Sequence, residues 1–209
     1  MKGGIGVKLL IGVPTVDMVN NVFAECLANL TKRLALDGVD FDLFVKRRTV
    51  VHVAREAIAQ KAAEEGYTHV LWLDSDMVFE PDVFEKLYGV MKDTKAAIVS
   101  CVYRNRHGKM GICLWSSLKP NTVVEELPKE TVFRIEGCGF GCVLTTVDII
   151  KRIRYDIAAC FHPTVEYGED LAFCARAKKA GAKAVATQDV MCGHIGNMMI
   201  GADGETKPL

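Results

Sequence analysis

Short apolar runs alternate with segments of helical periodicity along the first half of the chain. Buried strands are predicted at residues 8–13, 41–45, 70–73 and 96–102, and amphipathic helices at residues 18–36, 53–65 and 82–92. Gly38 and Gly66 end the first two helices, and Pro81 opens the third, where its missing N–H would have no partner in any case. This alternation predicts an α/β fold with a mostly parallel central sheet and helices on both faces.

The regular pattern lapses after residue 103 and returns at residue 132. Residues 104–131 mix Gly, Pro, Lys and Glu around an isolated Trp115, which indicates either an irregular excursion or a pair of edge strands. Beyond them, strands are predicted at residues 132–135, 142–145 and 183–187, and helices at residues 147–153, after a Thr146 cap, and 168–179. No repeat, low-complexity tract or linker interrupts residues 1–209, so we expect a single domain.

Two carboxylates stand at the end of the third predicted strand. Asp74 and Asp76 are two residues apart, so on an extended chain their side chains leave on the same side. Two acids that close repel each other unless a cation, an arginine or a proton intervenes. Mg²⁺ and Mn²⁺ prefer carboxylate oxygen and complete their coordination shell with substrate phosphates. The pair therefore favours a metal-diphosphate site, with the capping of a strand-to-helix turn as the structural alternative.

Two further patterns could carry chemistry. Gly137, Gly139 and Gly141 occupy alternate positions, which either lets the backbone approach a ligand or makes a tight bend. Glu169 and Asp170 open the last predicted helix, where acids also complement the positive end of the helix dipole. Each pattern therefore has a structural explanation beside the functional one.

The overall composition limits the partners that the protein can recruit. Lys plus Arg and Asp plus Glu each number 26, so no net charge attracts nucleic acid or an anionic membrane, and phosphate recognition has to be local. We find neither a signal-peptide core nor an apolar run of about 20 residues. We therefore expect a cytoplasmic protein without a membrane span.

Eight cysteines occur in this chain, most of them inside apolar strand-like or helical patterns. In a chain without an export signal, reduced and buried thiols explain them better than a disulfide framework. Cys138 and Cys142 are spaced by three residues, but no second Cys or His pair stands at zinc-finger spacing. Structural zinc is therefore disfavoured.

In their order along the chain, these motifs resemble those of the GT-A glycosyltransferases, especially the family-two-like enzymes that use nucleoside-diphosphate sugars. The resemblance extends from about Val7 to His194. Its matches are Val13-Pro14-Thr15, Ala54-Arg55-Glu56-Ala57, the DXD motif Leu73-Asp74-Ser75-Asp76-Met77, the turn Gly137-Cys138-Gly139-Phe140-Gly141, the ED helix Gly168-Glu169-Asp170 with Phe173 and Arg176, and His194 as a third metal ligand.

The resemblance implies a single Rossmann-like GT-A domain that moves a sugar from a UDP- or GDP-type nucleotide sugar to an acceptor hydroxyl. Asp76, His194 and, directly or through water or ribose, Asp74 would hold Mn²⁺ or Mg²⁺ on the donor diphosphate. Asp170, or in its place Glu169, would take the acceptor proton as general base. The residues bordering the nucleotide sugar would be Pro14, Thr15, Arg55, Asp74, Ser75, Asp76 and Gly139.

Two features depart from the family pattern. The second strand ends in Lys46-Arg47-Arg48, where many relatives have an acidic pair that contacts the base, and we interpret this basic run as a solvated strand end. The chain is also short beyond His194. Cover for the acceptor therefore has to come from residues 104–131, from residues 195–209, or from another subunit of a homo-oligomer.

Other functions fit parts of the same pattern. Asp74-Ser75-Asp76-Met77-Val78 also fits the signature of haloacid-dehalogenase-type phosphatases, in which the first Asp attacks phosphorus. That signature ordinarily ends the first strand, whereas two strand-helix units precede it here. A nucleotidyltransferase would carry a long glycine-rich phosphate loop, which the N-terminal sequence lacks. A non-catalytic module that binds sugar nucleotides or glycans is the alternative outside the enzymes.

Overall fold

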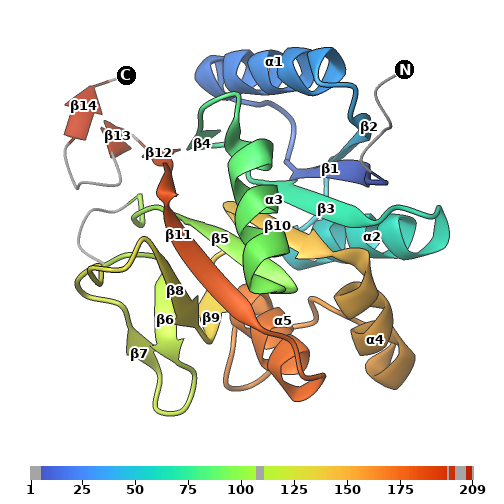
Figure 1. Cartoon of the computed structure of the whole chain (residues 1–209), viewed down its shortest axis with the longest axis vertical. Helices are drawn as coiled ribbons and strands as arrows, with labels where there is room; N and C mark the ends of the chain where they lie inside the picture. Colours follow the sequence, from blue (N-terminus) through green and yellow to red (C-terminus); the bar gives the residue numbers. More distant parts are fainter. Residues whose placement is uncertain (1–5, 107–110, 197, 201–205, 209) are drawn as a thin grey trace.

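The computed structural model describes residues 6–106, 111–196, 198–200 and 206–208. A seven-stranded sheet with the order β2-β1-β3-β10-β5-β11-β8 forms its centre (Figure 1). The strands are β1 (Lys8–Pro14), β2 (Asp40–Lys46), β3 (His69–Leu73), β5 (Ile98–Val102), β8 (Val132–Ile135), β10 (Cys142–Thr146) and β11 (Ala184–Met191). All run in one direction except β10 and β8, which are antiparallel to their neighbours. The predicted α/β class with a mostly parallel sheet is confirmed.

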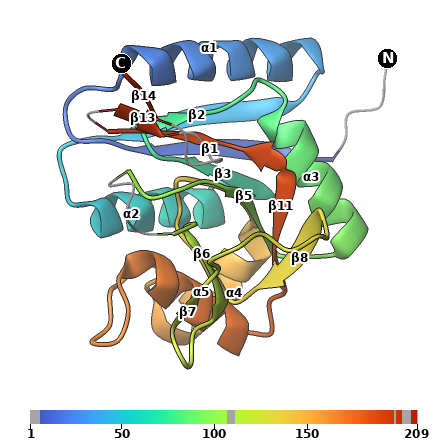
Figure 2. The ribbon, with the colours of Figure 1, turned by 90° about the vertical axis from the view of Figure 1, so that its left-hand side faces the viewer.

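Helices cover both faces of this sheet. On one face lie α1 (Asn21–Leu36) and α3 (Val83–Thr94), and on the other lie α2 (Val51–Glu64), α4 (Val147–Ile157) and α5 (Glu169–Lys179), as Figure 2 shows. The alternation of β1 supplies both layers, because Leu9 and Ile11 pack toward α1 and α3 while Leu10 packs toward α2. Each such side chain, once fully buried, contributes roughly 1.5–3 kcal/mol. Within the described ranges, no helix has the length and apolar character needed to cross a bilayer.

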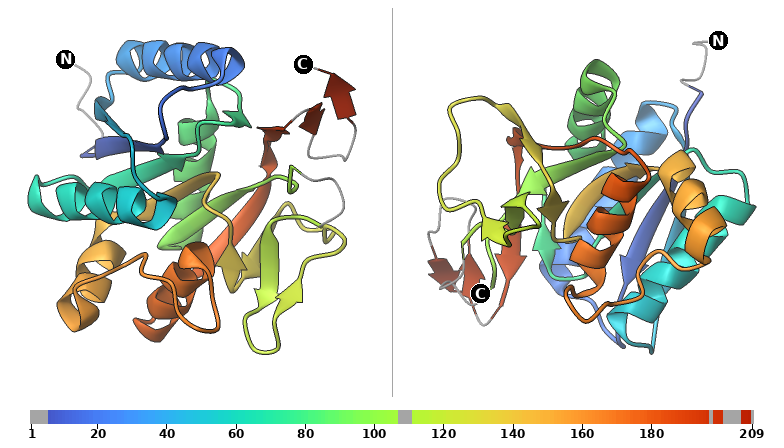
Figure 3. Two further views of the ribbon diagram at one scale, coloured as in Figure 1. Left: turned by 180° about the vertical axis from the view of Figure 1, so that it is seen from behind. Right: turned by 90° about the horizontal axis from the view of Figure 1, so that it is seen from below.

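Two small sheets flank the central one. The first contains β6 (Leu114–Ser117), β7 (Thr122–Val123) and β9 (Gly137–Cys138), and the second contains β4 (Met77–Val78), β12 (Gly193–Ile195), β13 (Met198–Ile200) and β14 (Thr206–Pro208). Both lie along the same side of the molecule (Figure 3). The stretch expected to be irregular or a pair of edge strands thus contains the β6–β7 pair. Its residues 107–110 lie outside the described part.

Local signals fix most of the element ends. The Asn20 side chain accepts a hydrogen bond from the Val22 N–H at 2.9 Å, so α1 begins at Asn21 and not at residue 18 as expected. Thr146 caps α4 as predicted, although the helix continues beyond the expected residue 153. Gly38 and Gly66 have φ of 70° and 77°, a left-handed conformation that costs glycine little, and they follow the ends of α1 and α2.

The cysteines are free, and six of the eight are buried. Cys26 and Cys113 are partly exposed, so the prediction of buried thiols is confirmed for the other six. Cys138 and Cys142 belong to different hydrophobic cores, one on each side of the sheet. Their close spacing in the sequence therefore does not bring their sulfurs into one site.

Candidate active site

Asp74 and Asp76 follow β3 directly, at the edge where the parallel strands end. The Asp74 N–H donates to the Gly141 carbonyl at 2.9 Å, and the Met77 N–H donates back to the Asp74 carbonyl at 3.2 Å. These bonds join the acidic turn to the glycine-rich turn and lead the chain into β4. The two carboxylate side chains are 28% and 29% exposed, so both are largely desolvated but open on one side.

A cleft of about 250 Å³ opens beside these carboxylates. Its walls come from the ends of β1 and β3, the start of α2 with the segment before it, and the loop after β5. The lining residues are Pro14, Thr15, Val16, Thr49, Val51, Asp74, Ser75, Asp76 and Arg106. The structure therefore brings five of the predicted nucleotide-sugar residues into one cleft.

The basic run at the end of β2 lies outside this cleft. Its backbone is tied to the segment after β1, because the Arg48 N–H donates to the Val16 carbonyl at 3.0 Å. The Arg48 side chain is 83% exposed and pairs with Asp17, and Arg47 is exposed as well. The interpretation of Lys46-Arg47-Arg48 as a solvated strand end agrees with this geometry, which leaves Thr49 as the neighbouring residue that reaches the cleft.

Arg55 lies beneath the cleft and binds three carboxylates at once. Its side chain, from α2, is only 3% exposed. Its Nη2 donates to both oxygens of Asp74, at 2.9 and 3.0 Å. Its Nη1 donates to Glu169 at 2.9 Å and makes a short contact with Asp170. Arg55 was predicted to border the nucleotide, but it is absent from the cleft wall. It connects the turn that carries Asp74 and Asp76, which we call the DXD turn, to the start of α5. We call Arg55 and its three carboxylate partners the Arg55 hub.

One guanidinium faces three carboxyl groups at the Arg55 hub, and burial raises the pKa of two of them. Although burial opposes its charge, the three carboxylates raise the pKa of Arg55 above its ordinary value, so the guanidinium stays protonated. Burial raises the pKa of Asp170 to about 7, because desolvation and the neighbouring Glu169 and Asp74 outweigh Arg55 and the bond from the Phe140 N–H. Burial likewise raises the pKa of Asp74 against the opposing charge of Arg55. Asp170 can thus exchange a proton near neutral pH.

An aromatic cluster supports this hub from below. Trp72, Phe140, Phe161 and Phe173 are fully buried and contact one another at ring-centroid distances of 4.7 to 5.7 Å. The guanidinium of Arg55 lies 5.7 Å from the centre of the Phe140 ring. The apolar floor excludes water from one side of the ion pairs, which strengthens them and also makes their loss costly.

His194 and Asp76 meet through the pairing of β12 with β4. His194 lies opposite Met77 in this ladder, and its Nε2 is 3.3 Å from an Asp76 carboxylate oxygen. Its Nδ1 is 3.0 Å from the Arg104 carbonyl, a bond that sets Nδ1 as the protonated nitrogen and directs Nε2 at Asp76. Burial opposes it, but the bond to Asp76 raises the pKa of His194, and His194 in turn lowers the pKa of Asp76.

The glycine-rich turn is shaped by close packing against other side chains. A Cβ on Gly139 would overlap the Tyr103 hydroxyl, and one on Gly141 would lie 2.9 Å from both Met77 and Tyr103. The Gly141 N–H donates to the Tyr103 hydroxyl at 3.1 Å. Gly139 does not line the cleft, so its predicted contact with the nucleotide sugar stays a prediction.

We expect Gly139→Ala to lower the free energy of unfolding by about 1–3 kcal/mol, because the buried Tyr103 hydroxyl cannot move without losing its bond. Urea denaturation measures this change. Adding Tyr103→Phe removes the overlapping oxygen and should return part of the loss. Gly89→Ala is the matched control, because it faces open space in α3 and should leave the protein equally or more stable. Equal effects at the two glycines would show that the turn tolerates a side chain.

Sequence patterns did not reveal two residues of this site. Arg106 lines the cleft and lies 3.2 Å from an Asp76 oxygen, but it follows the last regular strand before the irregular segment. Tyr103 packs against His194 with their rings 5.6 Å apart. Neither stands in a periodic pattern or a motif. The one available signal was their position just after a strand that ends at the same edge as β3.

Comparison with known sequences decides the family. The chain matches the model of glycosyl transferase family 2 over residues 28–169, well over half of its length. The chain is a member of glycosyl transferase family 2. The matched range contains the DXD turn, Arg55 and the glycine-rich turn and ends at Glu169, so Asp170 and His194 lie beyond it. No curated protein matches this family 2 member in sequence.

Several solved structures share the fold of this chain. A197 from STIV superposes with a TM-score of 0.69 at 17% identity, over 95% of this chain and 92% of A197. S. aureus TarS 1–349 in complex with UDP-GlcNAc gives 0.55 at 14% identity, over 87% of this chain and 56% of that one. GalNAc-T7 with UDP, GalNAc and Mn²⁺ gives 0.57 at 12% identity, over 91% and 43%. At these identities the likeness establishes the GT-A fold.

Proposed function

We propose that this family 2 glycosyltransferase uses a divalent metal to move a sugar from a nucleoside-diphosphate sugar to an acceptor hydroxyl. One observation carries the proposal: Asp74 belongs both to the cleft wall and to the Arg55 hub, and the same guanidinium also holds Asp170. Sugar transfer needs two adjacent sites: one that offsets the negative charge of the departing nucleotide, and one that takes a proton from the acceptor hydroxyl. Arg55 places the groups for the two tasks within one connected cluster.

The cleft suits a nucleoside diphosphate. Pro14, Val16 and Val51 in its lining offer apolar contact to a base and ribose, and Asp74 and Asp76 line the same cleft. TarS and GalNAc-T7, which share the fold, carry UDP-GlcNAc and UDP in their structures. These two proteins support a UDP-type donor as the first choice, with a GDP-type donor as the second.

Asp76 and His194 are the side chains that would hold the metal. They offer a carboxylate oxygen and an imidazole nitrogen 3.3 Å apart, a donor pair that suits Mn²⁺ better than Mg²⁺, which prefers oxygen alone. Asp74 shares its charge with Arg55, so it would serve the ion as the weaker ligand or through water. A metal ion held there would supply Lewis-acid chemistry that offsets the charge of the departing diphosphate.

Asp170 is the proposed general base. One of its oxygens contacts Arg55 and the other accepts from the Phe140 N–H at 3.3 Å, so the carboxylate is held in place and 27% exposed. A base with a pKa of about 7 is matched to a reaction at neutral pH. Glu169 touches Arg55 through one oxygen and is the second choice. Cover for the acceptor, from residues 104–131, the tail or a second subunit, stays a prediction.

We expect UDP to bind only in the presence of a divalent metal ion, and Asp76→Asn to weaken this metal-supported binding strongly, because the amide removes a charged ligand and keeps the shape. Calorimetric titration of UDP with MnCl₂ or with EDTA tests this. Asp93→Asn, an exposed carboxylate near the end of α3, is the matched control and should bind as the unaltered protein does. Equal affinity with and without metal would contradict the metal site.

Release of UDP from UDP-sugars separates an enzyme from a binding module. Metal-dependent binding without turnover on any acceptor tried would favour the non-catalytic alternative. Phosphate bound covalently to Asp74 would revive the phosphatase alternative, although both oxygens of Asp74 accept bonds from Arg55.

A further inference from the structure

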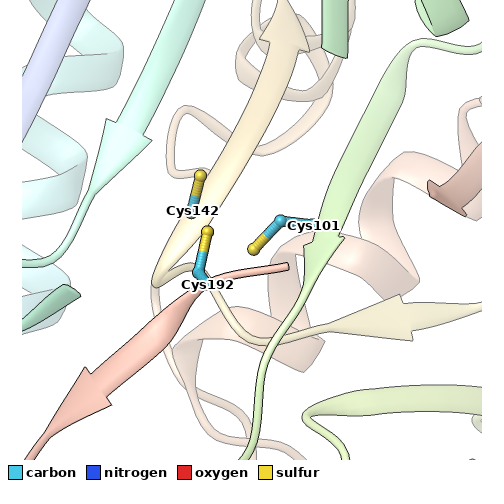
Figure 4. Close-up of side chains that lie close together, drawn as sticks. All are labelled: Cys101, Cys142 and Cys192. Carbon is cyan, nitrogen blue, oxygen red and sulfur yellow. The ribbon is translucent and has the colours of Figure 1, made fainter. Parts of the chain in front are cut away.

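Three buried cysteines converge at the ends of strands that lead into the candidate active site. Cys101 lies on β5, Cys142 on β10 and Cys192 directly after β11, and Figure 4 shows their side chains grouped between these strands. Each residue is fully buried. The three Sγ atoms all lie within 4.8 Å of one another. We call these residues the thiol triad.

The sheet, and not the sequence spacing, creates the triad. In the antiparallel β10–β5 ladder Val143 lies opposite Ser100, so Cys142 and Cys101 occupy the next rung. On the other side of β5, the Cys192 N–H donates to the Val102 carbonyl at 2.9 Å. The three side chains therefore leave neighbouring strands on the same face, within the core that α1 and α3 cover.

We infer that the thiol triad binds one thiophilic divalent d¹⁰ ion, Zn²⁺ in the first place. A Zn–S bond is about 2.3 Å long, so sulfurs around tetrahedral zinc lie about 3.8 Å apart. The sulfurs of the triad reach this separation by shifts of about 1 Å or less, within the freedom of their side chains. No further Cys, His, Asp or Glu of the described residues joins the group, which leaves the fourth position to water or another small donor.

Charge favours a divalent ion at this place. Each sulfur that coordinates releases its proton to solvent, so three thiolates around Zn²⁺ carry a net charge of −1, whereas around Cu⁺ they would carry −2. The triad lies in an apolar core, where the smaller net charge costs less free energy. Thiolate ligands at the same time disfavour Mg²⁺ and Mn²⁺, the ions proposed for the cleft. The two sites therefore select different metals.

An ion bound by the triad would tie together the strands that carry the active site. Cys142 follows Gly141, whose carbonyl accepts from the Asp74 N–H. Cys192 stands two residues before His194, and Cys101 two residues before Tyr103, which packs against His194. The expected role is thus structural: the ion would hold these strand ends in place and would take no part in sugar transfer.

Cd²⁺ binding to the reduced protein tests the triad directly, because Cd–thiolate charge-transfer absorption arises from sulfur ligands and not from carboxylate or imidazole. An Asp76→Asn background removes the proposed cleft site from the titration. We expect one equivalent of Cd²⁺ with the absorption of three thiolates, displacement by Zn²⁺, and a higher melting temperature with Zn²⁺ than with EDTA. This readout needs no variant of the triad itself.

Alanine variants assign the ligands. Cys101→Ala and Cys142→Ala should each lower the affinity for Cd²⁺ by more than about 100-fold, beyond what loss of an outer-shell partner costs. Cys160→Ala is the matched control, since Cys160 is also fully buried but lies in the other core. Absence of thiolate absorption, equal affinity in the triad variants and the control, or a protein mass lower by two hydrogen atoms, which marks a disulfide, would each overturn the inference.

Discussion

Asp170→Asn is expected to lower turnover by about 10²- to 10⁴-fold while the affinity for UDP changes little. The amide keeps the size of the side chain and its place beside Arg55 and the Phe140 N–H, but it cannot accept a proton from the acceptor. In the unaltered protein, activity should rise with pH through about 7 as Asp170 loses its proton. The variant should lack this rise. Turnover, UDP affinity and melting temperature, measured on the same samples, check the prediction.

Stability distinguishes this role from a structural one. A carboxyl whose pKa is raised on folding stabilises the fold most below its unfolded pKa, and this contribution is lost as the pH rises through about 7. An amide mimics the neutral form, so Asp170→Asn should melt no lower than the unaltered protein at pH 8. A helix-capping role predicts instead a loss of roughly 1 kcal/mol with turnover nearly intact.

Matched variants complete this experiment. Asp148→Asn removes an exposed first-turn acid from α4 and should change neither turnover nor binding. Near-normal turnover of Asp170→Asn would remove Asp170 from the mechanism. Inactivity of Glu169→Gln alone would exchange the two roles, and activity of both variants would favour a retaining reaction without a base at this helix.

Arg55→Met is expected to lower the free energy of unfolding by about 3–5 kcal/mol at pH 8, because it leaves Asp74, Glu169 and Asp170 without their buried counter-charge. Burial already raises the pKa of Asp74 and Asp170, so lowering the pH protonates them and relieves their repulsion. The loss should therefore be clearly smaller at pH 5.5. Urea denaturation at the two pH values measures both quantities.

Arg33→Met provides the comparison for a surface ion pair. Arg33 also contacts two carboxylates, Asp37 and Glu85, but its side chain is 46% exposed. Solvent screens such pairs, so this change should destabilise the protein far less than Arg55→Met and show little dependence on pH over the same range. A similar loss of unfolding free energy for the two variants, or a loss for Arg55→Met that does not change with pH, would contradict this account. It would show that the ion pairs of Arg55 are not what stabilises the fold there.

The sequence predicted those parts of the fold that depend on neighbouring residues. The apolar run before Asp74 and the stops at Gly38 and Gly66 are local signals, and the structure has β3, α1 and α2 where they indicate. The direction of β10 is different. This strand runs antiparallel to β3 and β5, and hydrophobic periodicity marks a strand without marking its direction.

The same distinction holds for the site. Residues at the carboxyl ends of β1 and β3 were predicted to border a nucleotide sugar. They share one cleft, because parallel strands end at the same edge, and their contact with a nucleotide sugar stays a prediction. Arg55 was singled out through resemblance, but its bonds to Glu169 and Asp170 span more than a hundred residues, and only the folded chain reveals them. The thiol triad likewise joins three strands and shares no spacing that a motif could describe.

Crystals soaked with UDP and MnCl₂, with anomalous diffraction recorded at the manganese absorption edge, test the proposed site most directly. We predict one manganese peak in direct contact with an Asp76 oxygen and the His194 Nε2, with the diphosphate on the ion, the base against Val16 and Val51, and Asp170 free of the nucleotide. UDP bound in this cleft without manganese, or manganese bound away from Asp76 and His194, would contradict the proposed metal-dependent mechanism.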